Sequence, residues 1–163
     1  MSVSGDAPSK LKPETLDLLF ELAREAPDGQ LRASDAVDSK TFQAFAASSV
    51  LIGLAALGGV RHSDLATAFV SVAVAAFLVA SVAASWALWS RRYRLSMGPR
   101  QLWDAYWSDD PSVIKHAFID DVASGYVENE KHIADKHKAF RYVLIALIVE
   151  AAAIGAALID SSV

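Results

Sequence analysis

The sequence predicts an all-α integral membrane protein with three transmembrane helices. Residues 42–60 and 65–89 contain no charged side chain, and each run reaches the roughly 20 residues that a helix needs to cross the hydrocarbon core. A third apolar run, residues 142–159, carries one charge, at Glu150. Because only residues 61–64 separate the first two runs, these are expected to form a tight antiparallel hairpin, and a long cytoplasmic helix is expected to lead into the third.

The composition limits the size and chemistry of the protein. A chain of 163 residues, 53% of them hydrophobic and with a net charge of −4, has room for one domain of ordinary size. It contains no cysteine, which excludes a disulfide framework, a thiolate zinc site and a cysteine nucleophile. The first 41 residues are acidic and lack the basic region that precedes the apolar core of a signal peptide, so no cleavage is expected.

Residues 1–41 are predicted to form a cytoplasmic N-terminal region with one amphipathic helix. Pro13 suits the first turn of that helix, and Pro27, Asp28 and Gly29 are expected to end it. Its apolar stripe favours packing on the rest of the protein. Binding to a membrane surface is the weaker alternative, because surface helices usually carry lysine and arginine on the polar face and this one is acidic.

Residues 42–89 are predicted to be the transmembrane hairpin. A buried hairpin in a soluble protein is the alternative, but a chain this short has too little other protein to cover every face of a 25-residue uncharged helix. Trp86, Trp89, Tyr93 and Tyr142 are expected at the headgroup level, as an aromatic belt.

Residues 90–141 are predicted to be a cytoplasmic helical region. Gly98 and Pro99 break the chain, and residues 101–107 form a short aromatic segment suited to the membrane interface. Asp110 and Pro111 are a good helix start, and no proline follows. One helix should therefore run from Pro111 to near Asp160, about 70 Å at 1.5 Å per residue, with Gly125 as its internal weak point.

Charge bias sets the predicted orientation. The basic residues that flank the second and third runs are Arg91, Arg92, Arg94, Lys136, Lys138 and Arg141, whereas the hairpin loop has only Arg61. Lysine and arginine favour the cytoplasmic side. The N-terminus and residues 90–141 are therefore expected in the cytoplasm, with the loop and the tail, residues 160–163, outside.

Glu150 is the candidate functional residue within the membrane. A carboxylate at the centre of a span costs about 2.5 to 3.5 kcal/mol on insertion scales, so the third span, residues 142–159, should insert only when the hairpin is present. One interpretation is structural, with Glu150 hydrogen-bonded to Ser48, Ser49, Ser71, Ser81 or Ser85. The other is a ring of Glu150 side chains from several subunits that lines a cation-preferring pore.

Candidate assembly residues lie in the spans and in the helix before the third span. Small residues recur at four-residue steps at Ala76, Ala80 and Ala84, and Gly155 lies four residues after Ala151. Such spacing allows close helix packing in lipid, either within one chain or between subunits. Asn129 is the polar member of a helical stripe that also holds Ile114, Phe118, Val122, Tyr126, Ile133, His137 and Phe140. A lone asparagine in such a stripe often fixes register or subunit number.

No motif supports an enzyme. Glycine-rich phosphate loops, nucleophile elbows and His-Glu-x-x-His runs are missing from the sequence. His116 with Asp120, and Glu128 with His132, are four residues apart, which ordinary solvated helix pairs explain better than a metal site. We therefore expect no catalytic residue, metal or other cofactor.

Asp38 and Lys40 lie just before the hairpin, a basic segment follows the second span, and Asn129, Ile133 and Lys136 precede the third. This layout, from about residue 14 to residue 160, resembles the SLATT group and the Pycsar-type transmembrane effectors of bacterial anti-phage defence. The resemblance implies homo-oligomers that permeabilise the inner membrane when a nucleotide messenger or a partner sensor activates them. Asp38, Lys40, Asn129 and Lys136 are the residues that match. No sensor domain is expected within these 163 residues.

The sequence therefore predicts a multi-pass protein of a bacterial or archaeal inner or plasma membrane. Its expected partners are the lipid bilayer and copies of itself, and a soluble activator or nucleotide messenger is compatible with the resemblance; nucleic acid is not expected. The leading functional prediction is an oligomeric effector that forms a pore or disrupts the membrane, in anti-phage defence. The alternative is a membrane-anchored scaffold or accessory subunit that recruits a soluble partner through its cytoplasmic helices.

Overall fold

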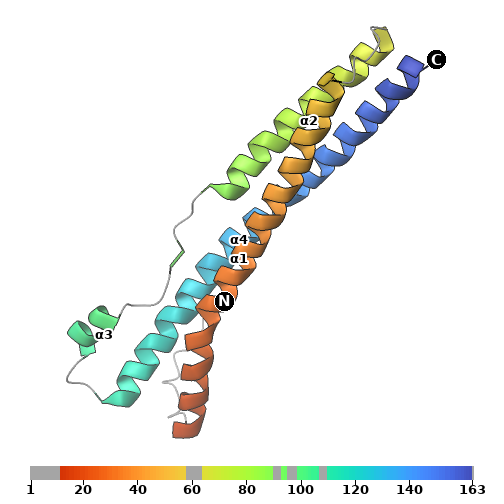
Figure 1. Ribbon diagram of the computed structural model, residues 1–163. Helices are drawn as coiled ribbons and strands as arrows, with labels where there is room; N and C mark the ends of the chain where they lie inside the picture. The colour runs from red at the N-terminus through yellow and green to blue at the C-terminus, as the bar shows by residue number, and fades with distance from the viewer. Residues whose placement is uncertain (1–11, 58–63, 90–92, 95–98, 107–109, 163) are drawn as a thin grey trace, which may run out of the picture. The chain divides into compact units, whose positions relative to one another are not determined.

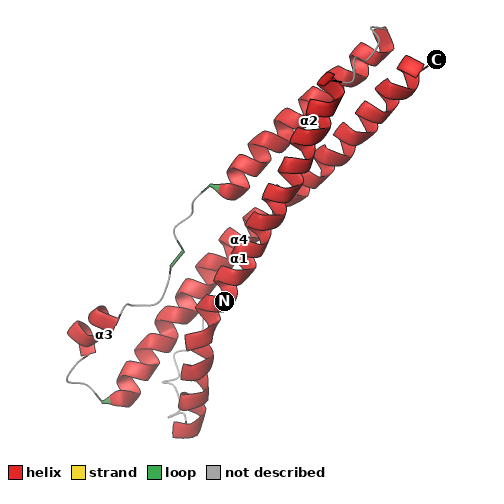
Figure 2. Ribbon diagram, viewed as in Figure 1, coloured by secondary structure: helices red, strands yellow, loops and turns green. Residues whose placement is uncertain are grey.

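The computed structural model describes residues 12–57, 64–89, 93–94, 99–106 and 110–162. These residues form four helices, α1 (Pro13–Leu57), α2 (Asp64–Leu88), α3 (Pro99–Tyr106) and α4 (Pro111–Ser162), which Figure 1 labels in chain order. Figure 2 colours the described residues as helix or loop, with no strand among them. The predicted all-α fold is confirmed. The predicted tight turn of the hairpin lies in residues 58–63, outside the described residues.

Helix α1 is longer than the sequence predicted. It begins at Pro13 as expected, but it continues through Pro27, Asp28 and Gly29, where the prediction ended it, to Leu57. A proline inside a helix removes one backbone hydrogen bond and costs about 3 kcal/mol. Gln30 and Ser34, buried on the next two turns, continue the packing face beyond the proline.

Helix α4 is the single long helix that the absence of prolines predicted. Asp110 caps its start, because its carboxylate oxygen accepts a hydrogen bond of 2.8 Å from the backbone N–H of Ser112. Gly125 lies inside the helix without interrupting it. The helix ends at Ser162, two residues beyond the predicted end at Asp160.

A seven-residue period governs which side chains are buried, and the sequence analysis did not detect it. On α4 the buried residues include Val122, Asn129, Lys136, Val143, Glu150 and Ala157. On α1 they include Leu16, Ala23, Gln30 and Val37, together with Ser34, Thr41 and Ser48. On α2 they include Ala66, Ala73, Ala80 and Ala87. A spacing of 3.5 residues per turn is typical of helices that wind around each other in a left-handed coiled coil.

This period corrects the predicted stripe on α4. Phe118, Val122 and Asn129 are buried as the stripe implied, but Tyr126 and His137 are exposed. The stripe advances mostly in steps of four residues, which exceeds the 3.5-residue average of the buried positions, so it drifts away from the packing face. The buried line instead continues through Lys136, whose charge removed it from a pattern based on apolar residues.

The chain divides into two compact units. The first contains residues 1–31 and 92–130, and therefore the starts of α1 and α4 together with α3. Its core is formed by Ala23, Phe118 and Val122, with Phe20 packed against Phe118 at a ring-centroid distance of 5.2 Å. The described residues of this core come from α1 and α4.

The second unit contains residues 32–91 and 131–163. Ala73 of α2 packs with Ala153 and Ile154 of α4, and Ala83 and Ala84 pack with Val143. The large apolar side chains of α2, such as Leu78 and Val82, are exposed instead. Among the described residues, α1, α2 and α4 are each long and apolar enough to cross a membrane. They contain residues 42–57 of the first predicted span, residues 65–88 of the second and all of the third.

Candidate functional site

Glu150 and Ser48 form a buried polar contact in the second unit. Both residues are 0% exposed, and the Ser48 hydroxyl donates a hydrogen bond to Glu150 Oε2. The other carboxylate oxygen, Oε1, has no hydrogen-bond partner within the described part of the chain. Of the serines predicted as partners, Ser49, Ser71 and Ser81 donate to carbonyls of their own helices.

The surroundings of Glu150 along α4 are apolar. Ala146 and Ala153, the buried residues nearest to it on the helix, and Val143 one heptad earlier carry no polar group. A buried carboxylate costs much free energy unless it is paired or protonated. One serine satisfies only one of its oxygens, so the group retains the capacity to bind a proton or a cation at Oε1.

Lys136, Asp38 and Ser34 form a second polar cluster, also in the second unit. Lys136 Nζ lies 2.6 Å from Asp38 Oδ2 and 2.9 Å from Ser34 Oγ. Only 5% of the Lys136 side chain is exposed, against 32% for Asp38. Ser34 and Asp38 are four residues apart on α1 and therefore present both oxygens to the same ammonium group. The cluster unites two residues of the family-like pattern, whereas Lys40 is exposed.

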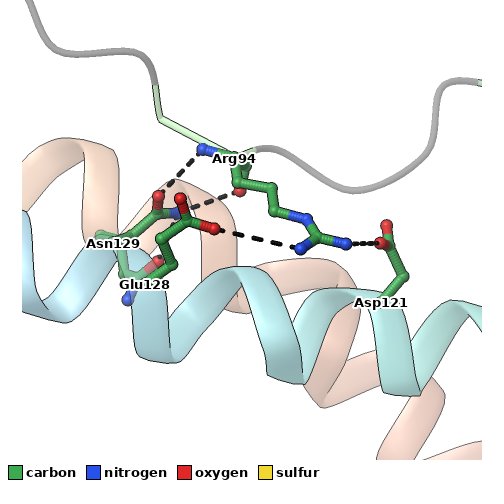
Figure 3. A network of polar contacts seen from close by, with 5 residues as sticks. Arg94, Asp121, Glu128 and Asn129 are labelled. Atoms are coloured by element: carbon green, nitrogen blue, oxygen red, sulfur yellow. Dashed lines mark hydrogen bonds and ion pairs between the residues drawn. The ribbon is translucent and has the colours of Figure 1, made fainter.

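Asn129 organises a polar network in the first unit, which Figure 3 shows around Arg94. Its side-chain oxygen accepts a hydrogen bond of 2.9 Å from the backbone N–H of Arg94, and its nitrogen donates to the Arg94 carbonyl at 3.0 Å. The same nitrogen donates to Gln30 Oε1 at 3.1 Å, and Gln30 donates to the carbonyl of Tyr126. Asn129 therefore joins α1, α4 and the segment at Arg94 within one chain.

The Arg94 side chain and Gly125 complete this network. The guanidinium lies 3.1 Å from an oxygen of Asp121 and 3.9 Å from an oxygen of Glu128 (Figure 3). A Cβ atom on Gly125 would lie 2.9 Å from the Arg94 carbonyl oxygen, which is closer than side chains tolerate. Gly125 is thus required for the close approach of Arg94 to α4.

Sequence reasoning missed Gln30, Ser34, Arg94 and Gly125 as members of these networks. The seven-residue spacing of Asn129, Lys136 and Glu150 was a signal that could have placed these three side chains on one face of α4. No comparable signal marks Arg94, because its contacts depend on which part of the chain returns to α4.

Of the predicted small-residue positions, those on α2 pack against neighbouring helices. Ala76, Ala80 and Ala84 are all buried in the second unit. Gly155 is half-buried, and a Cβ atom there would meet nothing within 4 Å. Within the described residues, no three histidine, aspartate or glutamate side chains are arranged to hold a metal ion.

Described residues of each unit line an open apolar groove on the surface. In the second unit, Leu78, Val79, Val82 and Ala83 line a groove of about 380 Å³ together with Trp86 and Tyr142. In the first unit, α1 and α4 form a groove of about 400 Å³. Comparisons with protein-family models, curated proteins and solved structures gave no match to the chain.

Proposed function

We propose that this chain is a multi-pass membrane protein that self-associates and makes the bilayer permeable to ions when it is activated. The single observation that carries the proposal is Glu150, a fully buried carboxylate with one oxygen unpaired among the described residues, in a helix apolar enough to span a membrane. Ionisable side chains at membrane depth usually face a bundle interior or an aqueous cavity and mark ion or proton pathways.

The distribution of small and large side chains supports membrane insertion. The buried face of α2 is alanine, whereas Leu78, Val79 and Val82 point outward. Helices in lipid pack through small residues and leave large apolar side chains to the acyl chains. Trp86 and Tyr142 line one groove, as expected of aromatic side chains at one headgroup level. The charge bias favours a cytoplasmic N-terminus.

The described arrangement corresponds to a closed form in this proposal. Glu150 faces Ser48 of the same chain, so it cannot line a pore until α1 and α4 separate at that point. A hydrogen bond to a charged group contributes about 1.5 to 3 kcal/mol. The binding free energy of an activator or of another subunit is large enough to offset the loss of this one hydrogen bond. Conduction by a ring of Glu150 side chains then favours cations.

The resemblance to anti-phage effectors supplies the biological setting of the proposal. Asp38 and Lys136, two residues that carry the resemblance, contact each other, which is what a shared structural role of the pattern would require. Activation by a nucleotide messenger or a sensor protein follows from the resemblance alone.

The test is ion leakage from liposomes that carry the purified protein. Addition of the activator, or induced clustering of a tagged protein, should release K⁺ in preference to Cl⁻. Glu150→Gln should reduce the preference for cations without changing the oligomer size. Glu14→Gln, which removes an exposed carboxylate at the start of α1, is the matched control and should behave as the parent protein. A defined oligomer that passes no ions under any activation would contradict the proposal.

A second candidate function is recruitment of a soluble partner to the membrane. The observation that favours it is the apolar groove of the first unit, which lies at least 15 residues from the nearest predicted span. Apolar surface at such a distance from the lipid marks an interaction site. Leakage assays separate the two candidates, because a scaffold passes no ions.

A further inference from the structure

Among the described residues, the groove of the first unit is an open position beside two packed helices. Leu19, Leu22 and Ala26 of α1 line one side, and Ile119, Tyr126 and Val127 of α4 line the other. The Leu22 and Val127 side chains are 57% and 56% exposed. In the second unit α2 covers the α1–α4 pair, whereas the first unit has no described third helix in this groove. The exposed apolar side chains therefore form a surface on which one more helix could pack.

The spacing of the lining residues suits a helical occupant. Leu19, Leu22 and Ala26 are three and four residues apart, and Ile119, Ala123 and Tyr126 repeat that spacing on α4. Two parallel rows of this kind form a groove that accepts the apolar stripe of an amphipathic helix. The Arg94 segment does not occupy it, because Arg94 contacts Asp121, Glu128 and Asn129, none of which lines the groove.

The charge around the groove is acidic. Residues 13–31 and 111–130, the parts of α1 and α4 in this unit, hold nine carboxylates and only Arg24 and Lys115 as permanent cations. Lys115 contacts Asp17, and Arg24 lies 3.9 Å from Glu21. Glu25, Asp120 and Glu130, each three residues from a lining residue on the same helix, are exposed. The edges of the groove therefore attract cationic side chains.

We propose that this groove binds an amphipathic helix with lysine or arginine on both sides of its apolar stripe, supplied by a soluble partner. This charge pattern argues against a second copy of the chain, because a second copy would bring its own Glu25, Asp120 and Glu130 to acidic edges. The proposal names the partner class of the recruitment function and does not depend on ion conduction. If the protein is also the pore-forming effector proposed above, this partner would be its activator.

The experiment uses the full chain in nanodiscs of zwitterionic lipid, with empty nanodiscs as the blank. The probe is a fluorescent peptide of about 18 residues that has leucine at helical spacing and lysine on both flanks of the leucine stripe. Fluorescence anisotropy should give saturable binding that weakens at least about tenfold when salt rises from about 0.05 M to about 0.3 M. A peptide with glutamate in place of lysine should bind at least about tenfold more weakly.

Variants locate the binding site. Leu22→Ser and Val127→Ser should each weaken binding about tenfold or more, because each removes an exposed apolar side chain that the helix would cover. Val113→Ser removes another exposed apolar side chain of α4, 45% exposed and away from the groove, and should leave binding unchanged. Glu25→Lys combined with Asp120→Lys should reverse the preference, so that the glutamate peptide binds more tightly. Circular dichroism confirms that each variant stays helical.

Three results would overturn the inference. One is lysine-peptide binding no stronger than to empty nanodiscs. Another is equal binding of the two peptides. The third is dimerisation of the chain that Leu22→Ser abolishes while the peptide has no effect, which would assign the groove to a second copy. Peptide binding without any leakage would support the inference and count against the pore, so the two proposals fail separately.

Discussion

Gly125→Ala is expected to detach the Arg94 segment from α4 while leaving the helix intact. The added Cβ atom would lie 2.9 Å from the Arg94 carbonyl oxygen, 3.5 Å from its Cγ and 3.7 Å from its Cβ. The contact at 2.9 Å is with backbone, which cannot rotate away as a flexible side chain does. Arg94 must therefore move, and its two hydrogen bonds with Asn129 must lengthen or break.

The magnitude follows from two opposing effects. Alanine in place of glycine inside a helix stabilises it by about 1 kcal/mol. Loss of the two Asn129–Arg94 hydrogen bonds costs about 2 kcal/mol at roughly 1 kcal/mol each, and the half-exposed Arg94 ion pairs add about 0 to 1 kcal/mol. The variant should therefore be about 1 kcal/mol less stable than the parent.

Gly29→Ala is the matched control for this measurement. Gly29 is an exposed residue inside α1, and a Cβ atom there meets nothing within 4 Å. That variant should be stabilised by up to about 1 kcal/mol, so the two alanine variants should differ by about 2 kcal/mol.

The assay combines urea unfolding in detergent with hydrogen exchange of the peptide that contains Arg94. Gly125→Ala should accelerate exchange at the Arg94 amide, whose proton is bound by Asn129, and Gly29→Ala should not. The reasoning is refuted if Gly125→Ala is as stabilising as Gly29→Ala and the Arg94 amide stays protected.

Three further predictions concern individual polar contacts. The hydrogen bonds from Ser112 lower the pKa of Asp110, so their contribution to the start of α4 is fully present above the unfolded-state pKa and is lost as pH falls through the lower folded-state pKa. Hydrogen exchange of residues 112–114 between neutral and acidic pH should show this loss, whereas Asp110→Ala should show fast exchange at every pH. Lys136→Met should lower the free energy of unfolding in urea by about 2 kcal/mol, because it leaves Asp38 half-buried without its cation. Asp38→Asn should lower it less, because Lys136 keeps its contact with Ser34. Equal decreases for the two variants would contradict this account. Ser48→Ala removes the hydrogen bond to Glu150 and should lower the activator concentration that starts leakage, whereas Ser85→Ala, at an exposed serine of α2, should not.

The helices were predictable where local signals agreed. Asp110 and Pro111 marked the start of α4, and no later residue gave a reason for it to stop before Asp160. Local signals failed at Pro27, where a proline, an aspartate and a glycine in succession are typical of a helix end. The packing face continues beyond them through Gln30 and Ser34, and a polar residue on a packing face gives no apolar signal to the sequence.

The polar contacts were predictable only as far as single helices determine them. The burial of Glu150 and its need for a serine followed from the span, but the choice of Ser48 depended on the register of α1 against α4. Asp38 and Lys136 were both singled out, yet 98 residues separate them and the spacing gave no sign that they meet. Gly125 was predicted to be a weak point of the helix. The contact that requires glycine there is with the carbonyl of Arg94, which lies outside α4 and cannot be predicted from the sequence of α4.

The alanine face of α2 has a mechanical consequence. In the second unit, two chemically different contacts fix the register of α1 against α4: Lys136 with Asp38, and Glu150 with Ser48. The face of α2 repeats the same residue every seven positions, from Ala66 to Ala87, so a slide by one heptad, about 10 Å, puts alanine in place of alanine. The stacking of Phe45 on Phe77, with ring centroids 5.9 Å apart, is a contact between large side chains that distinguishes one height of α2 from the next. The alanine face alone therefore fixes the height of α2 less specifically than the two polar pairs fix α1 against α4.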